Sequence, residues 1–168
     1  SPDARLRFLD DGIVSIFPPF VQTLSDYNKV IRQKNSLLQN AKKNEIPLEK
    51  VTKDLGPWND QLAALGSRIH KARVRFVERI NGDLEKKLFG REELTIRYLS
   101  SLEGKGDLDR YEELISERLE MRVNAELYSG YSLIGPHRDD LMIEFDGKEM
   151  RKFGSSGQQR SALLSLLL

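Results

Sequence analysis

The stretch FVQTLSDYNKVIRQKNSLLQNA, residues 20–41, decides most of the fold. Its apolar side chains recur at alternating spacings of four and three residues, which is the heptad pattern of a helix that packs along one seam. Lys34 occupies a seam position where an apolar residue belongs. The stretch therefore predicts a long helix with one apolar face. The other seam positions are Phe20, Leu24, Tyr27, Ile31, Leu38 and Ala41.

A second heptad seam follows after a break around Pro47. It runs from Trp58 to Phe76 and then drifts to every fourth residue, which broadens the packing surface. Two such helices joined by a connector at residues 44–57 predict an antiparallel hairpin, because each seam needs an apolar partner. The spacing fits either a projecting arm or a compact helical bundle. Lys34 separates the two, because a lysine can extend to solvent from a two-helix arm but not easily from a bundle centre.

The rest of the chain mixes helices and strands. We expect a capped helix over residues 1–16, with Leu6, Leu9 and Ile13 on one face, and an acidic helix from Asp109 that ends before Gly130. Alternating or apolar runs predict strands at 94–99, 131–134, 141–145 and 149–153, and a last helix begins near residue 158. The predicted fold class is α+β and mostly helical, with a coiled-coil-like hairpin and a small partial sheet. The predicted parts are a base helix (1–16), the hairpin arm (17–90) and an α/β sub-domain (91–168).

Composition excludes several functional classes. The 168 residues contain no cysteine and two histidines, which excludes disulfide frameworks, thiolate zinc sites and thiol catalysis. No apolar run approaches the ~18 residues that a membrane span needs. We therefore expect a cytoplasmic protein without a membrane partner or a bound metal of its own. The net charge of +1 hides two local asymmetries, a basic segment at 66–79 and an acidic one at 107–120.

The basic segment contains a row of cations at spacings of three and four residues, which places them on one side of a helix. Such a row can follow the phosphates of DNA, giving affinity that depends on salt and not on sequence. It can equally be a solvated face that exchanges ion pairs with the acidic helix. The row consists of Arg68, Lys71, Arg75 and Arg79.

A second candidate site is the run Ser155, Ser156, Gly157, Gln158, Gln159 and Arg160 at a predicted helix start. The first turn of a helix offers unpaired backbone N–H groups and a partial positive charge, which suit a phosphate. The glycine permits close approach of the backbone. A serine beside a glycine also caps many helices that bind nothing, so a purely structural role stays open.

A third candidate is the polar cluster His137, Arg138, Asp139 and Asp140. In one interpretation Arg138 pairs with an aspartate around a turn and His137 is an ordinary hydrogen-bonded side chain. In the other, the cluster faces a dimer interface or a partner protein, with Asp140 as the strongest contact candidate.

Combined, these motifs resemble the RecF family of bacterial DNA-repair proteins. The runs GPHRDDL (135–141) and FGSSGQQRSALLSL (153–166) resemble family motifs, as does SPDARLRFLD (1–10), in which Leu6 replaces the usual second basic residue. Tyr27, Lys34 and the segment from Trp58 to Leu62 are similar to the family's helical arm. The resemblance spans the whole chain.

The resemblance implies an ABC-type, SMC-like ATPase head that acts in DNA replication, recombination, repair and the SOS response. It implies that SSGQQR is the signature motif, with Ser155 donating to the γ-phosphate of ATP held by the opposite protomer. The implied cofactors of the full-length protein are ATP and Mg. The implied partners are a second copy joined through ATP, double-stranded DNA or single/double-strand junctions, and RecR with RecO, which assist in loading RecA at single-strand gaps.

The chain lacks two motifs that such an ATPase needs. It contains no G-x-x-x-x-G-K-[ST] phosphate loop and no apolar strand ending in paired acids that would hold magnesium. The apolar end at Leu166–Leu168 also suggests a piece cut from a larger protein. We therefore expect an internal fragment between the two nucleotide-binding motifs that neither binds nor hydrolyses ATP alone. The alternative is a non-catalytic helical scaffold in which the glycine-serine loop only caps a helix.

Overall fold

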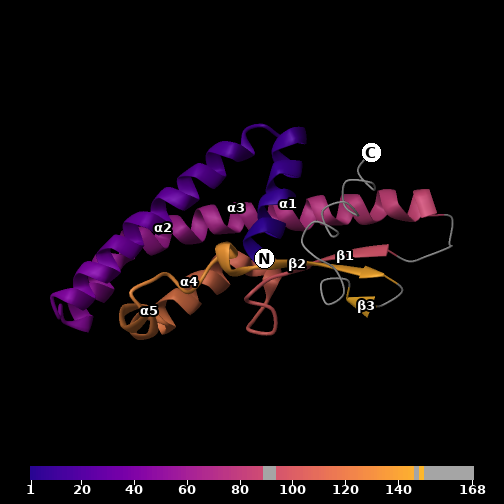
Figure 1. Cartoon of the computed structure of the whole chain (residues 1–168). Helices are drawn as coiled ribbons and strands as arrows, with labels where there is room; N and C mark the ends of the chain where they lie inside the picture. Colours follow the sequence, from indigo (N-terminus) through magenta and orange to yellow (C-terminus); the bar gives the residue numbers. More distant parts are fainter. Residues whose placement is uncertain (89–93, 146–147, 150–168) are drawn as a thin grey trace. The chain divides into compact units, whose positions relative to one another are not determined.

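The computed structural model describes residues 1–88, 94–145 and 148–149, and their contacts group the chain into two compact units. The first unit contains Ser1–Pro18, Lys71–Ser100 and the chain from Asp139 onward, and the second contains Pro19–His70 and Ser101–Arg138. Helix α3 (Leu48–Leu88) contributes to both units (Figure 1). The chain is predominantly helical with a small antiparallel sheet, so the predicted fold class is confirmed. The three-part division predicted from sequence stays a prediction.

The first unit combines helix α1 (Pro2–Ile16), the second part of α3 and a small sheet. Ser1 caps α1 by accepting a hydrogen bond from the Ala4 amide, and α1 ends before the prolines at 18 and 19, as predicted. The sheet has the order β1-β2-β3 and is antiparallel throughout. Its strands are β1 (Leu94–Leu99), β2 (Asp140–Phe145) and β3 (Lys148–Glu149).

The core of the first unit lies between α1, α3 and the sheet. Leu6, Leu9 and Ile13 are buried on the predicted face of α1. A methyl group on Gly12 would lie 2.9 Å from the Phe76 ring, so α1 and α3 approach closely. On the edge of β1, the amide of Asn81 donates to the Ile96 carbonyl and accepts from the Ile96 N–H, each at 2.8 Å. This side chain satisfies backbone groups that an edge strand leaves open.

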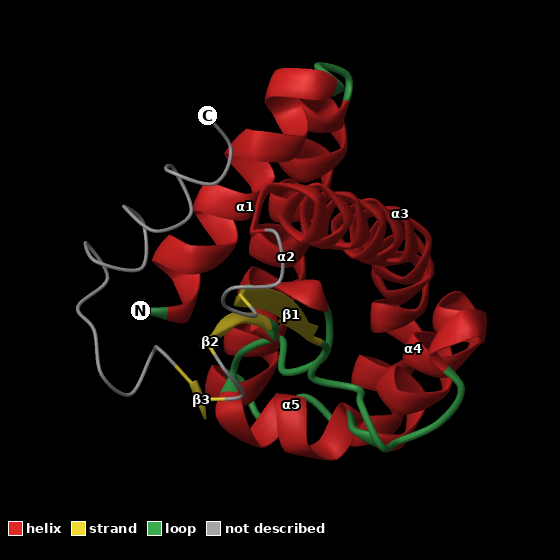
Figure 2. Ribbon diagram, turned by 90° about the vertical axis from the view of Figure 1, so that its right-hand side faces the viewer, coloured by secondary structure: helices red, strands yellow, loops and turns green. Residues whose placement is uncertain are grey.

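The second unit is built from helices and loops (Figure 2). Helix α2 (Phe20–Lys43) runs beside the first part of α3, and a short 3₁₀ turn (Leu108–Arg110), α4 (Tyr111–Met121) and α5 (Val123–Ser129) follow. The rings of His70 and Tyr111 stack with centroids 4.1 Å apart, which packs α4 on α3. One apolar cluster joins α2, α3 and α5 through Leu38, Ala41, Val51, Leu55 and Val123.

The connector between α2 and α3 is shorter than predicted. Helix α2 ends at Lys43 and α3 begins at Leu48, and Pro57 lies inside α3 instead of in the connector. Val51 and Leu55 are both fully buried in the apolar cluster. Burial of these two side chains extends the helix past a proline that sequence reasoning treats as its boundary. The predicted connector at 44–57 is therefore wrong for residues 48–57.

The predicted strand at 131–134 is also wrong. Its backbone groups are satisfied by side chains instead of a neighbouring strand: the Ser132 amide donates to Asn35 Oδ1 at 2.7 Å, and the Leu133 amide donates to Glu126 Oε2 at 2.8 Å. The segment is therefore an irregular stretch tied to α2 and α5. It continues into a 3₁₀ turn at Pro136–Arg138.

Candidate functional site

His137 is held inside the second unit by two hydrogen bonds. Its Nε2 lies 3.2 Å from the Ser132 carbonyl oxygen, and its Nδ1 lies 2.6 Å from the Tyr27 hydroxyl. A carbonyl only accepts, so Nε2 carries the proton, and in the neutral ring Nδ1 accepts from the Tyr27 O–H. This arrangement matches the interpretation of His137 as a hydrogen-bonded structural side chain.

Asp139 is 1% exposed and belongs to a polar network in the first unit. It accepts a hydrogen bond from the Tyr98 hydroxyl, which in turn accepts from Arg73 Nη1 at 3.1 Å. Arg73 also donates to both carboxylate oxygens of Asp10, at 2.8 and 2.9 Å. The network joins α1, α3, β1 and the residue that precedes β2.

Burial sets the protonation of this network. Desolvation raises the pKa of Tyr98 well above its ordinary value, and the carboxylate of Asp139 adds to the shift because it accepts a hydrogen bond from the phenol and would repel the phenolate. Burial of Arg73 opposes its charge, but the hydrogen bonds and charge interactions with Asp10 and Tyr98 together outweigh burial and raise the pKa of that guanidinium. Tyr98 and Arg73 therefore keep their protons at neutral pH, and their hydrogen bonds hold α1, α3, β1 and Asp139 together.

Asp140 forms an ion pair with Arg5 of α1. Arg5 Nε lies 2.8 Å from Oδ1 and Nη2 lies 3.1 Å from Oδ2, in the bidentate geometry that arginine and carboxylates prefer. The two side chains are 15% and 17% exposed. The arginine that pairs with this aspartate is therefore Arg5, whereas sequence reasoning paired Arg138 with an aspartate. Arg138 is exposed.

The four cations of the predicted DNA row are all exposed on α3. Arg68 belongs to the second unit, and Lys71, Arg75 and Arg79 belong to the first. The last three follow every fourth residue, so each is rotated by only about 40° from the one before. Within the described part of the second unit, Arg68 forms no ion pair with α4, whose Glu113 pairs with Arg110 instead.

The predicted signature motif, Ser155 to Arg160, lies outside the described residues. The phosphate site and the last helix therefore stay predictions. Among the residues that the structure does describe, no cluster of acidic or histidine side chains could hold a metal ion. The described helices also include none that is long and apolar enough to cross a membrane.

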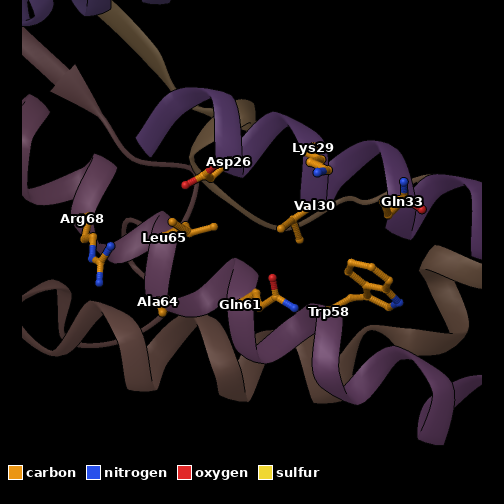
Figure 3. Close-up of a pocket in the computed structure, with 9 residues that line it drawn as sticks. All are labelled: Asp26, Lys29, Val30, Gln33, Trp58, Gln61, Ala64, Leu65 and Arg68. Atoms are coloured by element: carbon orange, nitrogen blue, oxygen red, sulfur yellow. The ribbon is translucent and has the colours of Figure 1, made fainter. Parts of the chain in front are cut away.

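A groove between α2 and α3 was missed by sequence reasoning (Figure 3). It has a volume of about 750 Å³ and lies within the second unit. Trp58 and Leu65 occupy seam positions, but in the structure both are only partly buried, so heptad spacing alone gave no signal for the groove. The groove is lined by Asp26, Lys29, Val30 and Gln33 of α2 and by Trp58, Gln61, Ala64, Leu65 and Arg68 of α3.

Comparison with curated proteins finds close similarity along almost the entire chain. The chain is 35% identical over 175 residues to the DNA replication and repair protein RecF of Alkaliphilus oremlandii, covering 99% of this chain and 46% of that protein. It is 37% identical to the protein of the same name from Roseiflexus castenholzii, covering 100% of this chain and 44% of the relative. The chain thus spans about half the length of the curated relatives it matches. No family model matches the sequence.

Solved structures give the same result for the fold. A structure described as the recombination mediator protein RecF with ATP in the RecFOR pathway superposes with a TM-score of 0.81 at 30% identity. A second, described as RecF-ATPrS in the same pathway, gives a TM-score of 0.80 at 29% identity. Each match covers 99% of this chain. The match to the structure with ATP covers 44% of the solved chain, and the match to the structure with ATPrS covers 45%.

Proposed function

We propose that this chain, a homologue of the RecF proteins over 99% of its length, is the part of a RecF-like DNA-repair ATPase that supplies the helical arm and the signature motif. The observation that carries the proposal is the fold match to a RecF structure described with ATP, which covers 99% of this chain and 44% of the solved chain. In the proposed assembly, ATP joins two copies of the full-length protein, and this part contacts nucleotide bound by the other copy.

The proposed ATP contact is made by Ser155, Ser156, Gly157, Gln158, Gln159 and Arg160. A helix start with a serine hydroxyl and an unobstructed glycine offers several donors to one phosphate. Because each copy supplies only part of the contacts, nucleotide binding and dimerisation are coupled, and ATP stabilises the dimer by mass action. Mg is proposed only for the full-length protein, since the sequence has no motif of its own for that ion.

The proposed DNA contact is made by the exposed cations of α3. Duplex DNA or a single/double-strand junction is the expected ligand, bound through its phosphates. We also propose that RecR, acting with RecO in loading RecA, is the partner protein. We further propose that the protein acts on the chromosome in the cytoplasm and takes part in the SOS response. Asp140 stays the proposed partner contact, in addition to its ion pair with Arg5.

That ion pair changes how the partner contact is tested. Asp140→Arg alone would place two arginines together and disturb α1, so loss of RecR binding would be ambiguous. The double variant Arg5→Asp with Asp140→Arg restores an ion pair while it reverses the exposed charge. Loss of RecR association in this double variant supports the contact, and unchanged association rejects it.

The main experiment measures ATP-dependent dimerisation of the full-length protein by analytical ultracentrifugation. Ser155→Arg is expected to abolish the dimer while each protomer still binds nucleotide, because the large cation blocks the approach to the partner's phosphate. The matched control is Ser116→Arg at an exposed position of α4, which is expected to dimerise normally. A Ser155→Arg protein that dimerises like the control would instead favour the non-catalytic scaffold.

A further inference from the structure

The groove between α2 and α3 combines a flat aromatic ring with cations. Trp58 is partly buried at one end of the groove, and Lys29 and Arg68 are exposed along it (Figure 3). Gln33 and Gln61 add exposed amide groups that can both donate and accept hydrogen bonds. A groove with an aromatic ring at one end and cations and amides farther along it combines the groups with which proteins hold unpaired nucleic-acid strands.

The groove presents no large, fully exposed hydrophobic side chain to a partner. The large hydrophobic side chains that are exposed in the described residues all lie elsewhere, so none of them lines the groove. An amphipathic helix would need such side chains as anchors. The apolar floor is instead limited to Val30, Ala64 and Leu65, together with the ring of Trp58.

We infer that this groove binds an unpaired DNA strand, with one base stacked on Trp58 and phosphates farther along the strand at Lys29 and Arg68. The inference rests on the proposed DNA-binding function and assigns a separate place to the single strand. Asp26 carries the one negative charge of the lining, and its carboxylate accepts a hydrogen bond from the Gln22 amide at 2.8 Å. Two cations against one acid leave the groove positive overall, which complements a phosphate backbone.

The test uses the full-length protein and a fluorescein-labelled dT 20-mer, with binding followed by fluorescence anisotropy at fixed salt. Trp58→Leu is expected to weaken binding about tenfold, since stacking of one base contributes substantially to affinity. Trp58→Phe keeps an aromatic face and is expected to lose less than threefold. An abasic strand of the same length should bind the wild type and Trp58→Leu equally, because it has phosphates but no bases.

Two variants at the exposed rim keep the test decisive if Trp58→Leu fails to fold. Lys29→Gln removes a positive charge and should weaken binding severalfold, whereas Asp26→Asn removes the negative charge and should strengthen it severalfold. Lys53→Gln, at an exposed site of α3 outside the groove, is the control and should change nothing.

The outcomes separate this inference from the proposed function. If the protein dimerises with ATP and binds duplex DNA, but the groove variants leave single-strand affinity unchanged, the groove assignment is wrong and the proposed function stands. A Trp58→Leu effect on self-association in the absence of DNA, without an effect on the dT strand, would also overturn it. If neither ATP-dependent dimerisation nor DNA binding occurs, the proposed function fails first.

Discussion

Lys34 of α2 and Glu126 of α5 form an ion pair whose two side chains are completely buried. Lys34 Nζ lies 2.9 and 3.0 Å from the two carboxylate oxygens, and both side chains are 0% exposed. Burial lowers the pKa of Lys34, although the attraction of Glu126 opposes this shift. Because Glu126 also accepts from the Leu133 amide, the pair ties α5 and the following irregular segment to α2.

Removal of one partner should be costly. Lys34→Met leaves an uncompensated carboxylate in the core, and we expect the free energy of unfolding to fall by about 3–5 kcal/mol. Lys34→Met combined with Glu126→Gln should recover much of this loss, because no charge remains buried and the amide oxygen still accepts from Leu133. Urea denaturation followed by circular dichroism measures both values. Lys43→Met, at an exposed position of α2, is the control, and an equal cost for it and Lys34→Met would contradict the prediction.

The raised pKa of Tyr98 predicts that the folded protein loses stability at alkaline pH. Its pKa is raised in the folded chain, mainly by burial, so the folded state keeps the phenolic proton above pH 10 while the unfolded state releases it. The contribution of this pKa shift to the free energy of unfolding is therefore fully present below pH 10. It falls by about 1.4 kcal/mol per pH unit above that value, until the folded pKa is reached.

Tyr98→Phe isolates this effect. At neutral pH the variant should be less stable by about 1–3 kcal/mol, because buried Asp139 loses a donor. The stability difference between wild type and variant should then shrink between pH 10 and 11. If the free energies of unfolding of the two proteins instead change in parallel over that interval, the pKa of Tyr98 is not raised by folding.

The sequence predicted the elements whose packing follows a simple period. The capped first helix and the strand at 94–99 appear with the expected bounds, since each depends on local signals and on one buried face. Spacing placed Lys34 on the seam, but its complete burial differs from the solvent-extended lysine expected of a two-helix arm. Its partner lies 92 residues away on α5, and only the folded chain brings the two charges together.

The candidate site was predictable in its residue types but not in its pairing. His137, Asp139 and Asp140 are adjacent in sequence, yet their partners are Tyr27, Tyr98 and Arg5, which come from three other elements. A sequence motif gives no information on such distant partners. The groove was missed for a related reason: heptad spacing predicts that every seam side chain is buried against the partner helix, and it does not show where the two helices leave a gap.

Gly135 lies where a side chain would collide with the His137 hydrogen bonds. Its φ of 139° is unusual for other residues, and a methyl group there would lie 2.1 Å from the Tyr27 hydroxyl oxygen and 3.0 Å from His137 Nδ1. We expect Gly135→Ala to lower the free energy of unfolding by about 1–3 kcal/mol. Adding Tyr27→Phe should restore part of it by removing the overlapping oxygen.

The matched control is Gly82→Ala in α3, where nothing lies within 4 Å of the added methyl group. Alanine there should raise the free energy of unfolding by about 0.5–1 kcal/mol, because glycine is unfavourable within a helix. Thermal melts of the two variants should therefore shift in opposite directions. A melting temperature of Gly135→Ala that does not fall would mean that space at Gly135 is not limiting.

Lys71, Arg75 and Arg79 allow a quantitative test of the proposed duplex contact. If each cation neutralises one phosphate, replacing all three with glutamine should reduce the salt slope of duplex affinity, d log K/d log[salt], by about 0.9 for each phosphate that is no longer neutralised. The effect should be the same for unrelated sequences, because phosphates carry no sequence information. Fluorescence anisotropy with the full-length protein, at salt concentrations from about 50 to about 200 mM, provides the slope.

The control for this measurement replaces three other exposed cations, Lys43, Lys53 and Lys105, with glutamine. Both triple variants change the net charge equally, so a general electrostatic effect would lower the two slopes alike. A slope that falls only in the α3 variant supports phosphate contact at those three side chains. An unchanged slope in both variants would instead identify the row as a solvated helix face, the other interpretation that the sequence left open.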